Sequence, residues 1–331
     1  MQQSLNQSLR FRDRVVFKRS ETAIDIRHGQ QGISIAIEAE TQSEIYQLLR
    51  CLRLGGRSRS QLIQDCPGLQ AQIPELLNVF EARGMLVSEY ATTQLAETYL
   101  SGSQFYRQLT QSLTRFKQQF PPSPLSQRLA DQSLSREQLI GYALESYQIT
   151  HLCTRLLAPA LAHPGSPTTQ KHLQDFFVSE LNHDQLLEKS LSSVGVAPTA
   201  LTQMQPLPMT FAVCSSLSVF AQQDPLSFKA ALMLFEEDDK AFYELFIQQC
   251  QALAMPTDFY QPILQHAHIN DEGGHDQLTA LLMNEIAYVS QAEQQRVKKN
   301  MTVLIESMIL RTYEILDYYG NENNKIPRCF P

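Results

Sequence analysis

The sequence lacks the features that mark membrane, secreted and zinc-cluster proteins. It has no run of about eighteen apolar residues, the length that a transmembrane helix needs. The first residues lack the apolar core of a signal peptide. Its 6 cysteines are scattered without any Cys-x-x-Cys pair, which predicts reduced thiols rather than a disulfide framework or a zinc cluster. We therefore expect a cytoplasmic protein with no membrane partner.

Positive charge is scarce as well. The chain has 27 Lys and Arg against 34 Asp and Glu, a net charge of −7. Up to Tyr90 the balance is 11 against 10, without the basic excess that a nucleic-acid-binding surface usually shows. The sequence also has no Gly-rich phosphate loop, no His-Glu-x-x-His and no Gly-x-Ser-x-Gly. These absences argue against nucleic-acid binding, nucleotide binding, zincin and serine-hydrolase functions.

Residues 1–91 are predicted to form a small α+β domain. Short runs of alternating or β-branched residues, such as Ala23-Ile-Asp-Ile26 and Ile33-Ser-Ile-Ala-Ile37, predict strands. Three helical segments follow, and the first begins near Thr41 with a Thr-x-x-Glu capping sequence. Strands followed by three helices are typical of a winged helix.

Residues 92–331 are predicted to be helical throughout, because amphipathic segments alternate with proline or glycine stops. The predicted helices span residues 95–120, 135–163, 166–193, 208–223, 225–254, 257–286 and 292–319. Short links between long helices indicate an up-down bundle of about seven helices. The expected fold class is therefore mainly α, with a small α+β domain in front.

Two segments of this region carry histidine and carboxylate residues at helical spacing. His268, Glu272 and His275 follow an i, i+4, i+7 pattern, which places them on one face of a helix. Glu180 and His183 stand at i and i+3 on an earlier predicted helix. Neutral nitrogens and anionic oxygens together suit iron, manganese or zinc. The pattern predicts a metal site, and the alternative is a set of ordinary surface or core histidines.

Glu145 adds a third helix to this prediction. It lies among apolar neighbours, and a carboxylate on a buried face is costly unless it is paired or metal-bound. The alternative is an exposed glutamate on a polar stripe. His151 and His172 lie near the ligand helices and are candidates for supporting contacts to the ligands. The aromatic residues proposed as walls of a substrate site are Phe176, Phe177, Phe211, Phe242 and Tyr243, with ordinary core packing as the alternative.

Two points in the downstream segment stay open. Asp271 is the alternative to Glu272 as a metal ligand, and it is also a candidate for supporting contacts to the ligands. Gly273 and Gly274 each weaken a helix by about 1 kcal/mol. Either this segment becomes ordered when metal binds, or the helix ends near Asn270 and a loop follows. His266, two residues before His268, falls on a different helical face and is a poor ligand candidate.

The positions of these residues resemble the ligand set of the heme-oxygenase-like diiron oxidases and oxygenases. Members of that family use a Glu on the first core helix, Glu-x2-His on the next, and His-x3-Asp/Glu-x2-His downstream. The resemblance covers about residues 95–320 and departs at Glu272, where many members have Asp. It implies a heme-oxygenase-like bundle holding two iron ions, or one iron and one manganese. The ligands it implies are Glu145, Glu180, His183, His268, Glu272 and His275. Related oxidases of pyrroloquinoline-quinone biosynthesis and thiaminase-like proteins share the bundle without this full set.

The order of strands and helices before residue 91 resembles the peptide-recognition modules of peptide-modifying enzymes. Those modules capture a leader peptide as a strand added to a sheet edge. The resemblance implies a ribosomally made peptide as partner. The alternative is a dimerisation or structural domain, and a homodimer is an open alternative for the assembly.

Together the two resemblances imply an O2-dependent non-heme diiron oxidase or oxygenase of natural-product biosynthesis. Such an enzyme would hydroxylate, desaturate or cleave a C–C bond of its peptide, with O2 as co-substrate and an external reductant. If the N-terminal domain is only structural, a free amino acid or fatty acid is the expected substrate. A metal-independent oxidase and a non-catalytic peptide-binding protein are the competing classes.

Overall fold

Two compact units make up the chain in this computed structural model. The first comprises Met1–Ser112 with Met283–Gln291, and the second comprises Leu113–Leu282 with Ala292–Pro331. The structure describes residues 8–12, 15–20, 22–38, 40–89, 99–162, 165–235, 240–272 and 277–329, with the backbone alone for 88, 89, 268 and 270–272. Because residues 90–98 lie outside this part, the predicted division between residues 91 and 92 stays a prediction.

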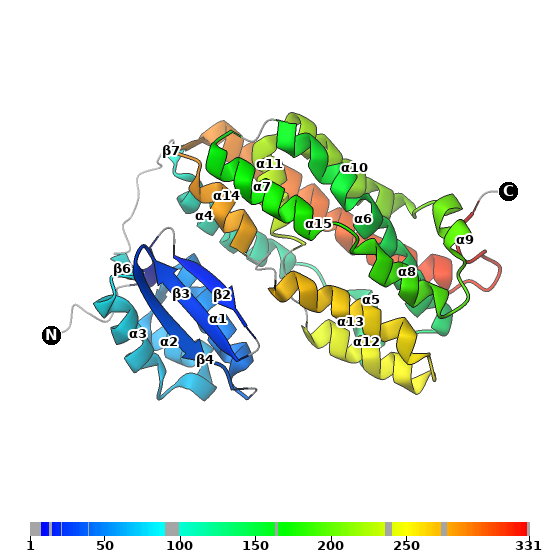
Figure 1. Cartoon of the computed structure of the whole chain (residues 1–331), viewed down its shortest axis with the longest axis horizontal. Helices are drawn as coiled ribbons and strands as arrows, with labels where there is room; N and C mark the ends of the chain where they lie inside the picture. The colour runs from blue at the N-terminus through cyan, green and yellow to red at the C-terminus, as the bar shows by residue number, and fades with distance from the viewer. Residues whose placement is uncertain are drawn as a thin grey trace. The chain divides into compact units, whose positions relative to one another are not determined.

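Two small antiparallel sheets and three helices occupy the start of the first unit (Figure 1). One sheet has the order β2 (Val16–Arg19), β3 (Ala23–His28), β4 (Gln31–Ala36). The other has the order β5 (Arg57–Ser58), β1 (Ser8–Phe11), β6 (Leu86–Glu89). The helices are α1 (Gln42–Leu54), α2 (Arg59–Asp65) and α3 (Ile73–Ala82), with a 3-10 turn at Pro67–Leu69. The predicted α+β composition of this region is therefore confirmed.

The core of this unit follows from its sequence periodicity. Alternate residues of β3, Ile24 and Ile26, are fully buried, as a strand with one covered face requires. The apolar stripe of α1 packs into the same cluster. The predicted capping pair at the start of α1 does not form, because Thr41 has a helical backbone and makes no side-chain cap. Glu44 instead accepts a hydrogen bond from the backbone N–H of Leu69 at 3.2 Å.

A distant segment completes the first unit. β7 (Tyr99–Leu100) pairs with β8 (Val289–Ser290) next to the start of α4 (Gly102–Lys117). The backbone N–H of Gly102 donates to the carbonyl of Ile286 at 2.9 Å. A Cβ at this position would lie 2.0 Å from the carbonyl oxygen of Met283, so only glycine allows the approach.

The second unit is a helical bundle. Its elements are α5 (Pro124–Ala130), α6 (Arg136–Ala162), α7 (Pro167–Ser179), α8 (Asp184–Ser192), α9 (Pro198–Gln203), α10 (Pro208–Gln223), α11 (Pro225–Leu232), α12 (Lys240–Ala252), α13 (Thr257–Glu272), α14 (Leu278–Asn284) and α15 (Gln291–Tyr319). The predicted helices over 208–223 and 292–319 are confirmed. Two other predicted helices, over 166–193 and 225–254, are each divided in two, giving α7 with α8 and α11 with α12. The predicted helix over 257–286 contains α13 and α14, and residues 273–276 between them lie outside the described residues. Among the described helices, none is long and apolar enough to cross a membrane.

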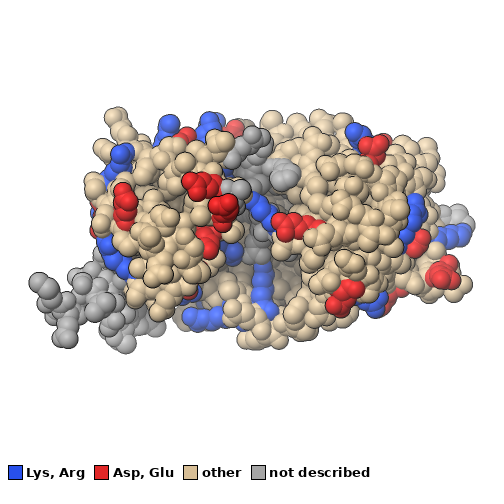
Figure 2. Space-filling model, turned by 90° about the horizontal axis from the view of Figure 1, so that it is seen from below, with Lys and Arg blue, Asp and Glu red and all other residues tan. Residues whose placement is uncertain are grey.

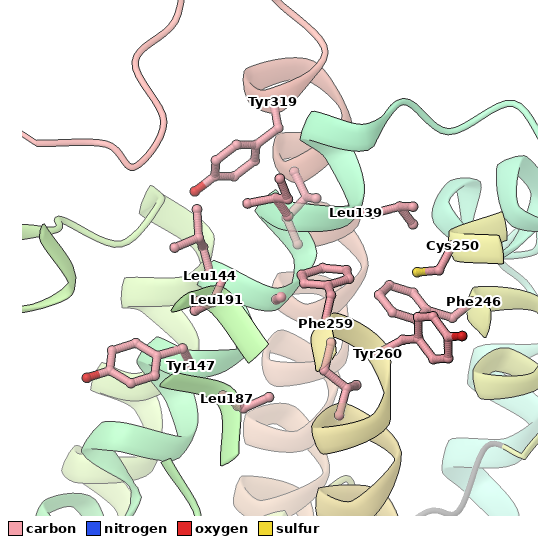
Figure 3. Close-up of a cluster of buried hydrophobic side chains, with 14 of the residues drawn as sticks. Leu139, Leu144, Tyr147, Leu187, Leu191, Phe246, Cys250, Phe259, Tyr260 and Tyr319 are labelled. Atoms are coloured by element: carbon pink, nitrogen blue, oxygen red, sulfur yellow. The ribbon is translucent and has the colours of Figure 1, made fainter. Parts of the chain in front are cut away.

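The main core of the bundle joins α6, α8, α12, α13 and α15. Figure 3 shows leucine and aromatic side chains from these helices converging, among them Leu144, Leu191, Phe259 and Tyr319. α6 and α15 approach closely at Gly141, where an added Cβ would lie 2.2 Å from the Tyr319 ring. Gly141 stands one turn before Glu145, so the same approach brings Tyr319 toward that carboxylate.

Charged side chains are sparse and mixed on the face drawn in Figure 2. Blue and red residues are interspersed over a mostly uncharged surface, and no broad field of one sign covers this face. A nucleic-acid-binding face would be expected to carry a continuous basic field.

Candidate metal centre

A break in the helix positions Glu180 and His183. The predicted helix over 166–193 stops at Ser179, and residues 180–183 form a turn before α8 begins. Asn182 in this turn has a φ of 67°, a left-handed conformation that asparagine tolerates better than most residues. The expectation that Glu180 and His183 lie on one continuous helix is therefore wrong. The turn nevertheless buries both, leaving Glu180 8% and His183 7% exposed.

The two side chains meet inside the bundle. Oε2 of Glu180 lies 3.4 Å from Nδ1 of His183, and this buried nitrogen has no hydrogen-bond partner in the described part of the chain. The thiol of Cys153 on α6 donates to the same carboxylate oxygen at 3.6 Å. Burial, and next the charge of Glu180, raise the pKa of the Cys153 thiol, so it stays protonated. A buried carboxylate and an imidazole nitrogen are thus held side by side.

His266 joins this pair from α13. Its ring lies edge-on to that of His183, with centroids 5.5 Å apart and planes at 79°. α13 runs antiparallel to α8. The Ser190 hydroxyl donates to the carbonyl of Phe259, and His183, seven residues before Ser190, contacts His266, seven residues after Phe259. This contact contradicts the expectation that His266 lies on a different helical face from the candidate site. The sequence signal for His266 was its spacing from Phe259 and Ile263, which places the three residues on one stripe of the helix. Phe259 and Ile263 are both buried.

The structure gives less for the downstream candidates. α13 includes the backbone of His268, Asp271 and Glu272, so the helix extends beyond the alternative end at Asn270. The side chains of these residues are not described, and His275 lies outside the described residues altogether. Their role as ligands stays a prediction.

Helical phase separates positions 266 and 268. They differ by about 200° around a regular helix. Position 266 shares the stripe of Phe259 and Ile263, which are buried. The backbone of α13 therefore brings His266 to the side of the helix that His183 contacts.

Glu145 is buried, as expected, but its partners are protein donors. It is 0% exposed on α6, which excludes the alternative of a surface glutamate. The hydroxyl of Tyr319 donates to Oε1 at 2.8 Å, and the backbone N–H of Leu207 donates to Oε2 at 3.1 Å. Burial, and next the charge of Glu145, raise the pKa of Tyr319, which therefore remains a donor. Leu207 is the N-cap of α10, whose positive helix end also favours the carboxylate.

The two histidines expected to support the ligands lie at different places. Nδ1 of His151 is 2.8 Å from Oδ2 of Asp184, the residue that follows His183. The His151 ring also stacks on Tyr147 at a centroid distance of 5.3 Å. His172 is half-buried on α7, about two turns before Glu180. His151 thus contacts the start of α8 at the residue next to His183.

Glu180 and His183 fit a metal ion. The buried Nδ1 without a hydrogen bond and the adjacent carboxylate are donors of the kind that iron, manganese and zinc take. Considering only side chains that the structure describes, no group of three His, Cys, Asp or Glu is arranged to hold a metal ion. A complete site would therefore need donors from positions such as 268–276, whose side chains are not described.

Comparison with solved structures identifies the bundle. A domain of unknown function with a heme oxygenase-like fold from Shewanella denitrificans OS217 aligns with a TM-score of 0.51 and 16% identity, covering 64% of this chain and 90% of that one. The chain has a heme-oxygenase-like fold. A TenA homolog from Pseudomonas syringae pv. tomato str. DC3000 aligns with a TM-score of 0.53 and 17% identity, covering 68% of this chain and 98% of that one. No family model matches the chain, and no curated protein matches it in sequence.

Proposed function

We propose that this heme-oxygenase-like protein is an O2-dependent, iron-containing oxidase or oxygenase. The observation that carries the proposal is the buried pair of Glu180 and His183, whose Nδ1 has no hydrogen-bond partner among the described residues. The sequence spacing of His268, Glu272 and His275, further along the chain, supports it. The set proposed to hold two iron ions, or one iron and one manganese, consists of these five residues, with Glu145 as a further ligand that the resemblance implies.

The protein itself would supply a compensating negative charge, a fixed orientation of the ligands and a site with little water. The Glu180 carboxylate offsets positive charge in a buried setting, where unpaired charge is costly. The protonated Cys153 thiol fixes the orientation of that carboxylate through its hydrogen bond. Apolar residues such as Leu187 and Phe259 limit the access of water from the core side. When bound, iron would supply the activation of O2.

We propose a peptide as the substrate class. The support is the small α+β unit, in which β4 is an outer strand of its sheet and pairs with β3 along Gln31–Ala36. An outer strand can accept an extended peptide as an additional strand. The probe is a synthetic copy of a short peptide encoded beside the gene, and we expect it to bind the full chain. Ser34→Pro is expected to weaken that binding, because a proline at this position disrupts β4.

Iron loading tests the oxidase proposal. The wild-type chain, loaded with Fe(II) without oxygen and desalted, is expected to retain iron and to consume O2 when a reductant is supplied. His183→Ala should lose both properties. His28→Ala is the matched control, because His28 is a half-buried histidine on β3 in the first unit.

Two results would count against this proposal. Full O2 consumption by metal-free protein, unaffected by His183→Ala, would indicate a metal-independent oxidase. A protein that retains no iron and consumes no O2, but still binds the peptide, would be a non-catalytic peptide-binding protein.

A further inference from the structure

One side of α10 is apolar where a surface helix is normally charged. The 16 residues of α10 include no Lys, Arg, Asp or Glu. Its outer side carries Phe211, which is 64% exposed, and Val219, which is 48% exposed. The expectation that Phe211 forms the wall of a substrate site is therefore wrong. Exposed apolar side chains on a helix without charge mark an interaction surface.

The outer side of α15 continues this character. Val303 is 56% exposed, Leu310 is 51% exposed, and Tyr313 follows one turn later at 42%. Their spacing of seven and three residues keeps them on one stripe of the helix. Glu306 lies between them and is exposed as well. The stripe thus carries three exposed apolar side chains, with the Glu306 carboxylate between Val303 and Leu310.

α10 and α15 lie along each other in opposite directions (Figure 1). At one end Glu314 accepts a hydrogen bond from the backbone N–H of Met209 at 2.7 Å. At the other end Arg296 donates to both carboxylate oxygens of Asp224, at 2.8 and 3.3 Å. This register places Phe211 at the level of Leu310.

The same register places Val219 at the level of Val303. Phe211 and Val219 are eight residues apart on α10, and Val303 and Leu310 are seven apart on α15, which is about 11 Å on each helix. Exposed apolar residues therefore recur at matching heights on the two neighbouring helices.

Charge at the two ends of the α15 stripe indicates the occupant. Lys299 is exposed toward the beginning of the helix and Asp317 toward its end. If two copies of α15 pair antiparallel across a two-fold axis, the basic end of one lies against the acidic end of the other. The same pairing sets Val303 against Tyr313 of the second copy, near its Leu310, and sets Leu310 beside the stem of the second copy's Glu306. Such a face is complementary to itself, as a two-fold interface requires.

We propose that the α10/α15 face, defined by Phe211, Val219, Val303, Leu310 and Tyr313, binds a second copy of this chain, with the two α15 helices antiparallel. The overlap of the two helices measures about 24 Å by 20 Å, or about 500 Å². The remainder of α15 extends it toward the roughly 800 Å² per partner of a stable interface. The proposal is independent of the metal site.

The mass of the full chain in solution tests this. Sedimentation equilibrium of the wild type at micromolar concentration should give about twice 37.6 kDa. Leu310→Glu and Phe211→Glu should each raise the dimer dissociation constant at least tenfold, because each places a charge in an apolar contact. Leu253→Glu is the matched control, an exposed leucine at the end of α12 outside the face. A thermal melt followed by circular dichroism confirms that each variant is folded.

A charge exchange decides the geometry even if an apolar substitution impairs folding. Lys299→Asp alone and Asp317→Lys alone should each weaken the dimer about tenfold, and the double variant should recover most of that loss. A wild type that stays monomeric at 100 µM would overturn the proposal. The proposal would also be overturned if the Leu310→Glu and Lys299→Asp variants are folded and dimerise with the same affinity as the wild type.

Discussion

Glu145 and Glu180 are two buried carboxylates of one helical unit, and their surroundings differ. Glu145 accepts hydrogen bonds from a tyrosine hydroxyl and a backbone N–H at the start of α10. The contacts of Glu180 include a thiol and an imidazole nitrogen that lies 3.4 Å away without forming a hydrogen bond. A buried charge requires compensation in both places. Ordinary protein donors supply it for Glu145, whereas the contacts of Glu180 include two side chains, Cys153 and His183, of types that bind metal ions.

Burial by itself does not say which of the two carboxylates would bind a metal ion. Both carboxylates lie in a helical unit and both are nearly inaccessible, so position and exposure do not separate them. The chemistry of the neighbours does. The five predictions below test this contrast, beginning with the largest expected change in free energy.

Glu145→Ala should give the largest loss of stability. It leaves the Tyr319 hydroxyl and the Leu207 N–H buried without their acceptor, and we expect the free energy of unfolding to fall by about 3–5 kcal/mol. Urea denaturation of the metal-free protein measures it. Glu137→Ala on the same helix is the control, because Glu137 is exposed. A loss below about 1 kcal/mol would mean that these hydrogen bonds do not stabilise the fold.

Glu180→Gln should act on metal binding rather than on the fold. We expect the affinity for Fe(II) to fall at least 100-fold, equivalent to about 2.7 kcal/mol, while the metal-free protein keeps its melting temperature. Anaerobic competition with a chelator gives the affinity. Glu188→Gln, on α8 and half-buried, serves as the comparison. Equal affinities in both variants would remove Glu180 from the site.

Tyr319→Phe should destabilise the protein by about 2 kcal/mol, because it removes one charge-assisted hydrogen bond to Glu145. Tyr318→Phe offers a control at the adjacent position, where the hydroxyl donates to the exposed backbone carbonyl of Lys325. The difference between the two unfolding free energies isolates the buried bond. Similar losses in the two variants would contradict a special role for Tyr319.

His266→Ala should weaken Fe(II) binding about tenfold, or about 1.4 kcal/mol, because His266 lies against the ring of His183. His268→Ala provides the comparison on the same helix. If His268→Ala abolishes binding while His266→Ala leaves it unchanged, the ligand role belongs to the residue that the spacing predicted, and His266 only packs.

Asp224 should give the smallest effect, and one that depends on pH. Partial burial acts to raise its pKa, but hydrogen bonds from Arg296 and Ser227 outweigh it and hold the pKa below the usual value. The ionised form therefore stabilises the fold above the ordinary Asp pKa near 4, and this contribution disappears as the pH falls through the lowered pKa.

We expect the wild type to lose more stability than Asp224→Asn between pH 6 and pH 3, by less than about 1 kcal/mol. Urea titrations at several pH values measure this difference. Parallel curves for the two proteins would show that the ion pair with Arg296 has no net effect.

Helix boundaries marked by proline were predictable from the sequence. α10 begins at Pro208 and ends before Pro225, as its composition predicted. The break between α7 and α8 was not predictable, because Glu-Leu-Asn-His contains neither glycine nor proline. Asn182 adopts its left-handed conformation without any local breaker, in a turn whose flanking residues Glu180 and His183 are buried.

The burial of Glu145 was predictable from its apolar neighbours, but its partners were not. Tyr319 is 174 residues away along the chain and Leu207 is 62 residues away, so no local pattern links them. The position of His266 was not predictable from the spacing around His268 for a related reason. The buried stripe of Phe259 and Ile263 fixes the side of α13 that faces α8, and its burial depends on tertiary packing.

The sequence by itself determined the mainly helical fold class and the donor types near the candidate site, since periodicity and residue chemistry are local properties. Tertiary structure alone decided which carboxylate is satisfied by protein donors and which histidine meets His183. Those outcomes depend on the packing of α13 against α8 and of α15 against α6. Helix packing is set by contacts between residues far apart in the chain, which no single segment encodes.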